Sequence, residues 1–420
     1  MRKTLILIWS CGLALVIGAI ALSWNSKPYW MDADGYALVV AAHRWVIHPP
    51  GHILFVALGR LLFALAFADC VLPTGSGVVF IHQPTSFCEP SQWAIALEHA
   101  HFTLQVLTLL STLGGTLLLY RLLREVVGPV QSSLLAFVFS LSWIPLLINH
   151  TGTSHASDLF TVPLLLLTAI RVTARSTPLA AAALALSVVL CGGFRLTTLI
   201  MMGPLILAVL WVNRRSSNVW VACAVGGLMS GLMQLLTIRM YGGFAQYVGM
   251  VDKMDHINGV RSVIHAGFTL PALCNLGRSL LWFGLATLGL PFALLYLRGP
   301  RLWNSKQRVF LTFGALATAG PLALCSLYLC EHPGYLAPAL AGFYLCVAVA
   351  WDRAEGRRAF ATWPIAAAVV SVLLFFGMHY YRAPATHGQA VANALLLQFS
   401  ADGSRHAFYV SSSDWSVTEQ

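Results

Sequence analysis

Long apolar stretches alternate with short polar ones along almost the whole chain, and this pattern predicts a polytopic membrane protein. A helix needs about 20 consecutive apolar residues to cross a bilayer. We therefore expect an all-α bundle of about eleven transmembrane helices. The predicted crossings are residues 4–23, 93–119, 131–148, 159–170 with its flanks, 179–190, 196–212, 219–237, 279–297, 309–329, 336–350 and 363–378.

The apolar stretch 53–68 is interpreted differently from the others. It is short for a crossing and carries Arg60 near its middle. Apolar segments below the spanning length are more often interfacial or buried. We therefore predict a helix lying at the outer membrane face, with an ordinary second span as the alternative. Residues 37–46 predict another short helix, which Pro49 and Pro50 would end.

Composition and charge agree with a membrane protein. Hydrophobic residues make up 58% of the 420-residue chain and charged residues 10%, and the mean hydropathy is +0.75. The formal net charge is +10. In a soluble protein this excess would suggest nucleic acid. Here the basic residues fall in particular short loops, as the positive-inside rule describes, so we expect no nucleic-acid partner.

The same rule sets the expected orientation. Arg2 and Lys3 precede the first apolar stretch, which no Ala-x-Ala-like cleavage site follows, so we predict an uncleaved span with a cytoplasmic N-terminus. The expected location is the cell membrane, that is, a bacterial inner membrane.

We divide the chain into a membrane module, residues 1–381, and a short external tail, residues 382–420. Residues 24–92 form the first external loop.

Polar residues that could take part in catalysis or binding gather on the predicted outer face. The first external loop carries Asp32, Asp34 and Tyr36, followed by the motif His48-Pro-Pro-Gly-His52. An acidic side chain in the bilayer core costs about 2.5–3.5 kcal/mol on insertion scales, so this segment belongs at a membrane face. The predicted inner loops hold little beyond basic residues. Any chemistry is therefore expected outside the cytoplasm.

These motifs resemble the GT-C glycosyltransferases, and more narrowly their branch related to protein O-mannosyltransferases. The resemblance rests on an external Asp-x-Asp-Gly-Tyr at residues 32–36 after an uncleaved span, and on the following His-Pro-Pro-Gly at residues 48–51. Residues 104–120 look like that family's second span. Cys191 to Thr198 looks like its short mid-chain helix pair with a polar break, and His332-Pro-Gly-Tyr335 looks like its late external motif.

The resemblance implies a membrane glycosyltransferase that moves a sugar from a polyprenyl-phosphate donor to a lipid, glycan or protein acceptor, with inversion. A carboxylate of the first external loop would be the general base, and cationic groups would stabilise the leaving phosphate. We assign the base to Asp34, with Asp32 as the other candidate. The expected substrate-binding residues are His48, Tyr36, Arg195, His332 and Tyr335.

Each of these residues also has a plainer interpretation. Asp32 and Asp34 would serve equally as caps of the 37–46 helix. His48 would pack on the prolines, and Arg195 would extend to the membrane interface. His150, His155 and Asp158 have only loose metal-like spacing, which favours a solvated loop. Two further polar segments are noted: Glu98-His-Ala-His101 predicts contacts between helices, and 241–275 predicts a long outer loop.

Other functions fit the sequence less well. The chain has no Gly-rich phosphate loop, no Gly-x-Ser-x-Gly elbow and no His-Glu-x-x-His. We expect no metal ligand set and no certain cofactor, and the need for a divalent metal stays open. The alternative function is a transporter or flippase of lipid-linked saccharides, although transporters place their charges at mid-membrane and often show repeats. A membrane scaffold would leave the acidic loop unexplained.

Cys70 and Cys88 are predicted to form a disulfide in the first external loop. Compartments outside the cytoplasm are oxidising, so paired cysteines there tend to bridge. The enclosed loop of about seventeen residues would gain roughly 3 kcal/mol in the chain-entropy model. The bridge would hold the Pro49-Pro50 segment close to the next span. Two reduced cysteines are the alternative.

Overall fold

The structure is a computed structural model that describes residues 2–25, 52–66, 90–240, 242–287, 304–328, 332–353 and 366–376. Within these ranges every regular element is a helix. Several predictions fall on other parts of the chain and remain predictions: the 37–46 helix, the roles of Asp32, Asp34, Tyr36 and His48, the Cys70–Cys88 disulfide and the 382–420 tail.

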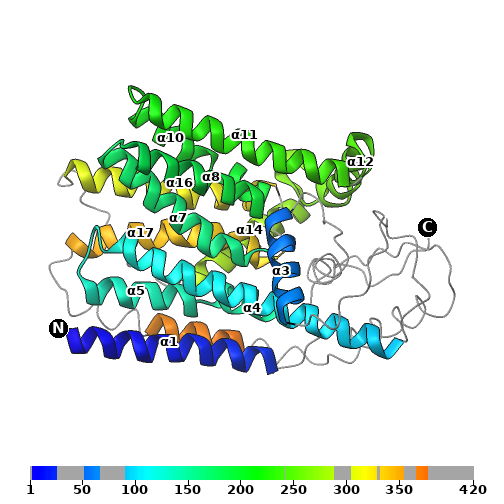
Figure 1. Cartoon of the computed structure of the whole chain (residues 1–420), viewed down its shortest axis with the longest axis horizontal. Coiled ribbons are helices and arrows are strands. Elements are labelled where there is room, and N and C mark those ends of the chain that lie inside the picture. Colours follow the sequence, from blue (N-terminus) through cyan, green and yellow to red (C-terminus); the bar gives the residue numbers. More distant parts are fainter. Residues whose placement is uncertain are drawn as a thin grey trace.

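Most helices run side by side along the long axis of the molecule (Figure 1). The helices of this bundle are α1 (Arg2–Asn25), α4 (Pro90–Leu123), α5 (Pro129–Leu141), α6 (Trp143–Thr151), α7 (Ala156–Ala174), α8 (Pro178–Phe194), α9 (Leu196–Met201), α10 (Gly203–Val212), α11 (Ser217–Met240), α14 (Leu270–Thr287), α16 (Ser305–Leu327) and α17 (Ala337–Arg353). They form one apolar core.

The helix lengths confirm an all-α polytopic membrane protein. In the part of the chain that the structure describes, six helices are long and apolar enough to cross a bilayer, or seven if the bent pair α5 and α6 is one span. The apolar helices Pro178–Phe194, Gly203–Val212 and Ala366–Phe376 are shorter. These three helices, together with α14, which is not among the candidate spans, account for the difference from the eleven predicted crossings within the described residues. The predicted span 131–148 is divided at Ser142 by a bend of 49°.

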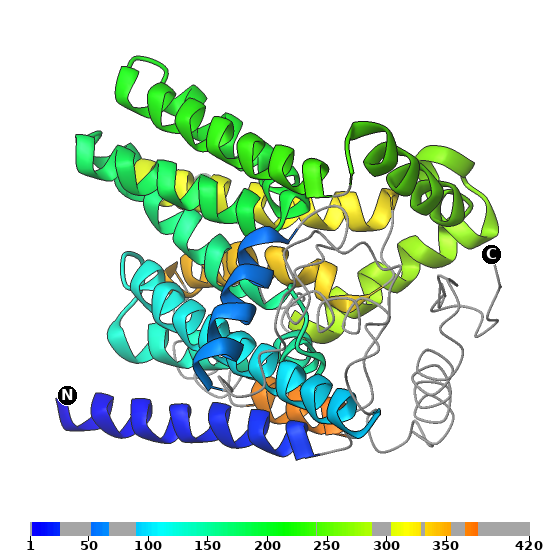
Figure 2. The same cartoon turned by 45° about the vertical axis from the view of Figure 1, so that its right-hand side comes forward.

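Helix α3 (Ile53–Ala66) does not follow the bundle. It runs across the other helices in both views, beside the middle of α4 and the end of α8 (Figures 1 and 2). Its 14 residues span roughly 21 Å, less than the thickness of a hydrocarbon core. This is the orientation predicted for a helix at a membrane face. The bundle has two ends. The end crossed by α3 is called the α3 end. The other end, where Arg2 lies, is called the opposite end.

The segment after α11 differs from the sequence interpretation. We expected a long loop over 241–275, but the structure has α12 (Phe244–Gly259), α13 (Val263–Ala266) and the first turn of α14 there. No proline interrupts residues 244–259, so a helix can form in spite of their polarity. The predicted span 279–297 therefore begins nine residues too late.

Glycines allow the helices near the α3 end to pack closely. A Cβ atom on Gly115 of α4 would lie 2.0 Å from the carbonyl oxygen of Leu159 in α7. A Cβ on Gly193, at the end of α8, would lie 2.6 Å from Leu54 of α3. Small residues at helix contacts are typical of membrane bundles, where close packing provides much of the association energy. These contacts bring α3, α7 and the end of α8 together.

Candidate functional site

The site is built around a break between two helices. Helix α8 ends at Phe194, Arg195 has an extended backbone, and α9 begins at Leu196. The Arg195 side chain turns inward, is only 2% exposed and forms an ion pair with Asp158. The interpretation that Arg195 extends to the membrane interface is therefore wrong. The buried guanidinium needs compensation from its neighbours, because an isolated charge in this position is very costly.

Asp158 provides that compensation from the first turn of α7. Its side chain is 1% exposed, and its second carboxylate oxygen accepts a hydrogen bond from the hydroxyl of Thr198. The prediction of a solvated loop for His150, His155 and Asp158 is wrong, since all three are buried. The turn at Gly152, whose φ is +66°, folds the chain back at this point and lets α6 and α7 enclose these side chains.

The late motif meets the same arginine. His332 precedes the short 3-10 helix η3 (Pro333–Leu336), and its Nδ1 accepts a hydrogen bond from the N–H of Gly334 at 3.0 Å. The ring of Tyr335 faces the Arg195 guanidinium, whose carbon lies 5.1 Å from the ring centroid. The carbonyl oxygen of Tyr335 accepts a hydrogen bond from the thiol of Cys325 at 3.4 Å. The structure thus brings three predicted site residues together: Arg195, His332 and Tyr335.

His155 joins the late motif to the helix break. Its ring stacks on His332 with centroids 5.4 Å apart and meets the edge of Tyr335 at 4.5 Å. Gly334 is pressed against it, since a Cβ there would lie 2.7 Å from the imidazole. Burial lowers the pKa of His155 well below its usual range, and the charge of Arg195, then those of His332 and His52, lower this pKa further. The imidazole is therefore neutral at physiological pH.

The first-loop motif reaches the site through its last residue. His52 is buried, and its Nδ1 donates a hydrogen bond to the carbonyl oxygen of Phe194 at 3.2 Å. This contact fixes the start of α3 next to Arg195. Sequence reasoning selected His48 from this motif and passed over His52. One feature of the sequence could have pointed to His52. It lies between the two prolines and an apolar helix, a position in which a polar side chain is readily buried in a hydrogen bond.

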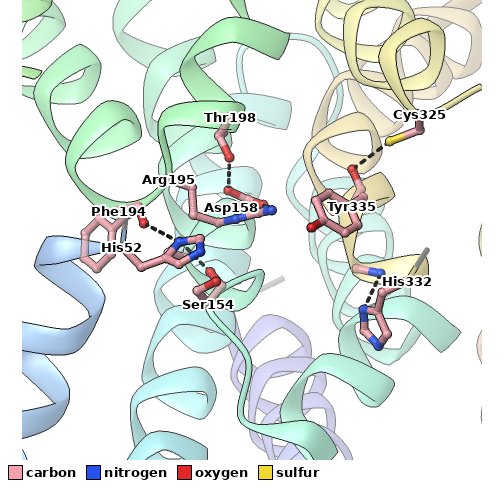
Figure 3. A network of polar contacts seen from close by, with 11 residues as sticks. His52, Ser154, Asp158, Phe194, Arg195, Thr198, Cys325, His332 and Tyr335 are labelled. Atoms are coloured by element: carbon pink, nitrogen blue, oxygen red, sulfur yellow. Dashed lines mark hydrogen bonds and ion pairs between the residues drawn. The ribbon is translucent and has the colours of Figure 1, made fainter. Parts of the chain in front are cut away.

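Figure 3 shows these side chains from close by, with His52, Asp158, Arg195 and Thr198 on one side and His332 and Tyr335 on the other. Among the described residues, Arg195 Nε and His155 Nδ1 of this site have no hydrogen-bond partner. Both belong to side chains that contact the Tyr335 ring. Together with the charge of Arg195, they suit a ligand with anionic or hydroxyl oxygen atoms.

Two of the solved structures that resemble this chain are of one protein. The crystal structure of ArnT from Cupriavidus metallidurans bound to undecaprenyl phosphate aligns with a TM-score of 0.48 and 13% sequence identity, over 94% of this chain and 74% of that chain. The structure of the same protein in the apo state aligns with a TM-score of 0.43 and 12% identity, over 88% and 74%. No family model matches the sequence, and no curated protein matches it.

The described residues hold no group of three or more His, Cys, Asp or Glu side chains suited to a metal ion. The carboxylate of Asp158 contacts Arg195 and Thr198.

Proposed function

We propose that this protein is a membrane glycosyltransferase that transfers a sugar from a polyprenyl-phosphate donor to an acceptor at the outer membrane face. One observation carries the proposal. Three segments that resemble GT-C motifs contribute residues around Arg195. His52 donates a hydrogen bond to the backbone carbonyl of Phe194, the residue before Arg195, and the ring of Tyr335 faces the Arg195 guanidinium. A buried arginine that is enclosed by segments far apart in the sequence is a candidate for substrate binding.

In this proposal Arg195 binds the donor phosphate. Arginine suits phosphate because its planar donors match the oxygen geometry and its charge persists at any physiological pH. Asp158 and Thr198 hold the guanidinium in place, and Tyr335 covers one of its faces. A fixed cation can stabilise the negative charge that develops on the leaving phosphate without reorganising during the reaction.

The bond changes require one further group, a general base. The acceptor oxygen forms a bond to the anomeric carbon, the bond from that carbon to the phosphate oxygen breaks, and the acceptor proton passes to a carboxylate. Attack opposite the leaving group inverts the configuration. We assign the carboxylate to Asp34, with Asp32 as the alternative, and give His48 and Tyr36 contacts to the substrates. The acceptor is a lipid, glycan or protein.

A transporter or flippase of lipid-linked saccharides is the second candidate. One observation favours it: a buried ion pair at a helix break, Asp158–Arg195, is also typical of substrate sites in transporters. The two functions differ in their product. A transferase converts the donor to free polyprenyl phosphate, whereas a transporter leaves the donor chemically unchanged and moves it between leaflets.

The test supplies labelled polyprenyl-phosphate sugars to membranes that contain the protein and follows label on any acceptor. We expect transfer by the natural protein. Arg195→Ala should raise the donor KM and lower kcat far more than Arg195→Lys, which keeps the charge. Arg124→Gln, at the opposite end of the bundle, is the matched control and should transfer normally. Movement of intact donor between leaflets without transfer would instead indicate a transporter.

A further inference from the structure

Two turns at the opposite end of the bundle are tied together by side chains. They are the α7–α8 turn with the end of α7, residues 171–177, and the α10–α11 turn with the adjoining helix ends, residues 212–218. Asn213 Nδ2 donates a hydrogen bond to the hydroxyl of Thr173 at 3.0 Å, and Asn218 Nδ2 donates to the carbonyl oxygen of Ser176 at 3.5 Å. The hydroxyls of Ser176 and Ser216 also contact each other. The two turns therefore form one fixed surface.

This surface carries a concentration of positive charge. Arg171, Arg175, Arg214 and Arg215 are all exposed, and among the described residues none of the four has a carboxylate partner. An open hollow of about 550 Å³ is lined by residues 212–216. The α4–α5 turn at the same end is different, because there Glu125 lies 3.8 Å from Lys306 and offsets its charge. We call residues 171–177 and 212–218 the arginine surface.

Two exposed tryptophans border the arginine surface. Trp211 is 72% exposed, and the guanidinium of Arg214 lies over its ring at 5.5 Å. Trp220 is 50% exposed, and its Nε1 donates a hydrogen bond to the carbonyl oxygen of Arg214 at 3.3 Å. Exposed tryptophan is typical of the membrane–water boundary. Leu207 and Val221, on the same two helices, are exposed apolar side chains suited to acyl chains.

We propose that the arginine surface binds the phosphate headgroup of an anionic phospholipid, with its acyl chains against α10 and α11. The arginines would be at headgroup height, because the tryptophans mark the boundary and the apolar side chains lie beyond it. Basic pockets between membrane helices are suited to such headgroups. The adjoining apolar surface favours a lipid over a free anion. This site is separate from the Arg195 site and does not depend on the proposed transferase activity.

The test measures thermal stability of the detergent-solubilised full chain during titration with short-chain phosphatidylglycerol, short-chain phosphatidylcholine or inorganic phosphate. Phosphatidylglycerol should raise the Tm at a lower concentration than phosphatidylcholine does. The double variant Arg214→Gln, Arg215→Gln should weaken the phosphatidylglycerol effect about 30-fold, given the usual contribution of two arginines at a membrane surface. The variant with lysine at both positions should keep most of the effect and shows whether charge alone suffices.

Arg121→Gln combined with Arg124→Gln is the matched control. It removes two exposed positive charges from the same end of the bundle but leaves the arginine surface intact. This control should keep the natural preference for phosphatidylglycerol. An equal loss in the control would overturn the proposal, because the preference would then reflect total charge. An equal stabilisation by inorganic phosphate would also overturn it, since the surface would then be an anion site and not a lipid site.

Discussion

Two ion pairs at opposite ends of the bundle show how differently this protein uses charge. Asp158 and Arg195 are 1% and 2% exposed, lie at a helix break and are surrounded by other polar side chains. Glu125 and Lys306 are 44% and 62% exposed and meet at 3.8 Å on the surface. Exposed pairs contribute little to stability, whereas burying a pair carries a large desolvation cost. The buried pair therefore needs an explanation beyond folding, and the substrate binding that we propose would provide one.

The largest effect that we expect belongs to the first external loop. Asp34→Asn should lower the rate of sugar transfer about 10²–10⁴-fold, since loss of a general base typically costs this much. Transfer of labelled sugar to acceptor is the measurement, and membrane insertion should be unchanged. Normal transfer by Asp34→Asn with an inactive Asp32→Asn would move the role to Asp32. Full activity of the double variant would refute a carboxylate base in this loop.

Breaking the buried pair should be the next largest effect. Asp158→Asn leaves the Arg195 charge buried without its counter-ion, which typically costs about 3–5 kcal/mol of stability. Replacing both members together, Asp158→Leu with Arg195→Met, should restore much of the stability but no transfer. Unfolding in detergent and the transfer assay separate the two properties. A double variant with normal transfer would show that the pair is structural.

Acid should destabilise the α3 end through His155. The pKa of His155 is well below its usual value of 6.5 in the folded protein, because burial and Arg195 oppose its protonation. Below about pH 6.5 the imidazole of His155 therefore binds a proton in the unfolded chain but not in the folded protein. Stability falls as pH decreases for this reason. We expect the Tm to fall between pH 7.5 and pH 5.5, and His155→Gln to reduce this decrease. An identical pH profile in the variant would contradict the assignment.

The smallest effect should come from the exposed pair. Glu125→Gln should change the free energy of unfolding by about 0–1 kcal/mol, as is usual for a surface ion pair. Added salt should make little further difference to this variant, because its charge interaction is already absent. Thermal unfolding at low and high salt is the measurement. A loss as large as that of Asp158→Asn would remove the contrast between the two ends.

The fold class follows directly from the sequence, because long apolar stretches have few structural solutions. The orientation of α3 could also be predicted, since 53–68 is short and contains Arg60. The helices over 244–259 and 263–266 were missed, because polar residues near a membrane do not distinguish a helix from a loop. Helix ends depend on local caps and packing, which hydropathy does not describe.

The site could be predicted only in part. Arg195, His332 and Tyr335 were found from motifs, and the structure brings them together. Asp158 and His155 were missed because their burial depends on partners far away in the sequence: Arg195 is 37 residues from Asp158. Local spacing shows neither such a pair nor the stacking of His155 on His332. His52 was likewise passed over, since its partner is a backbone carbonyl that no side-chain pattern indicates.

Crosslinking with a photoreactive polyprenyl phosphate tests the central claim most directly. The probe would be activated in membranes containing the natural protein, and the labelled peptides identified by mass spectrometry. Our account predicts label near His52, Arg195 and Tyr335, competition by unmodified polyprenyl phosphate, and loss of label in Arg195→Ala. Label confined to the arginine surface around Arg214, unchanged in Arg195→Ala, would contradict a lipid-phosphate site at the helix break.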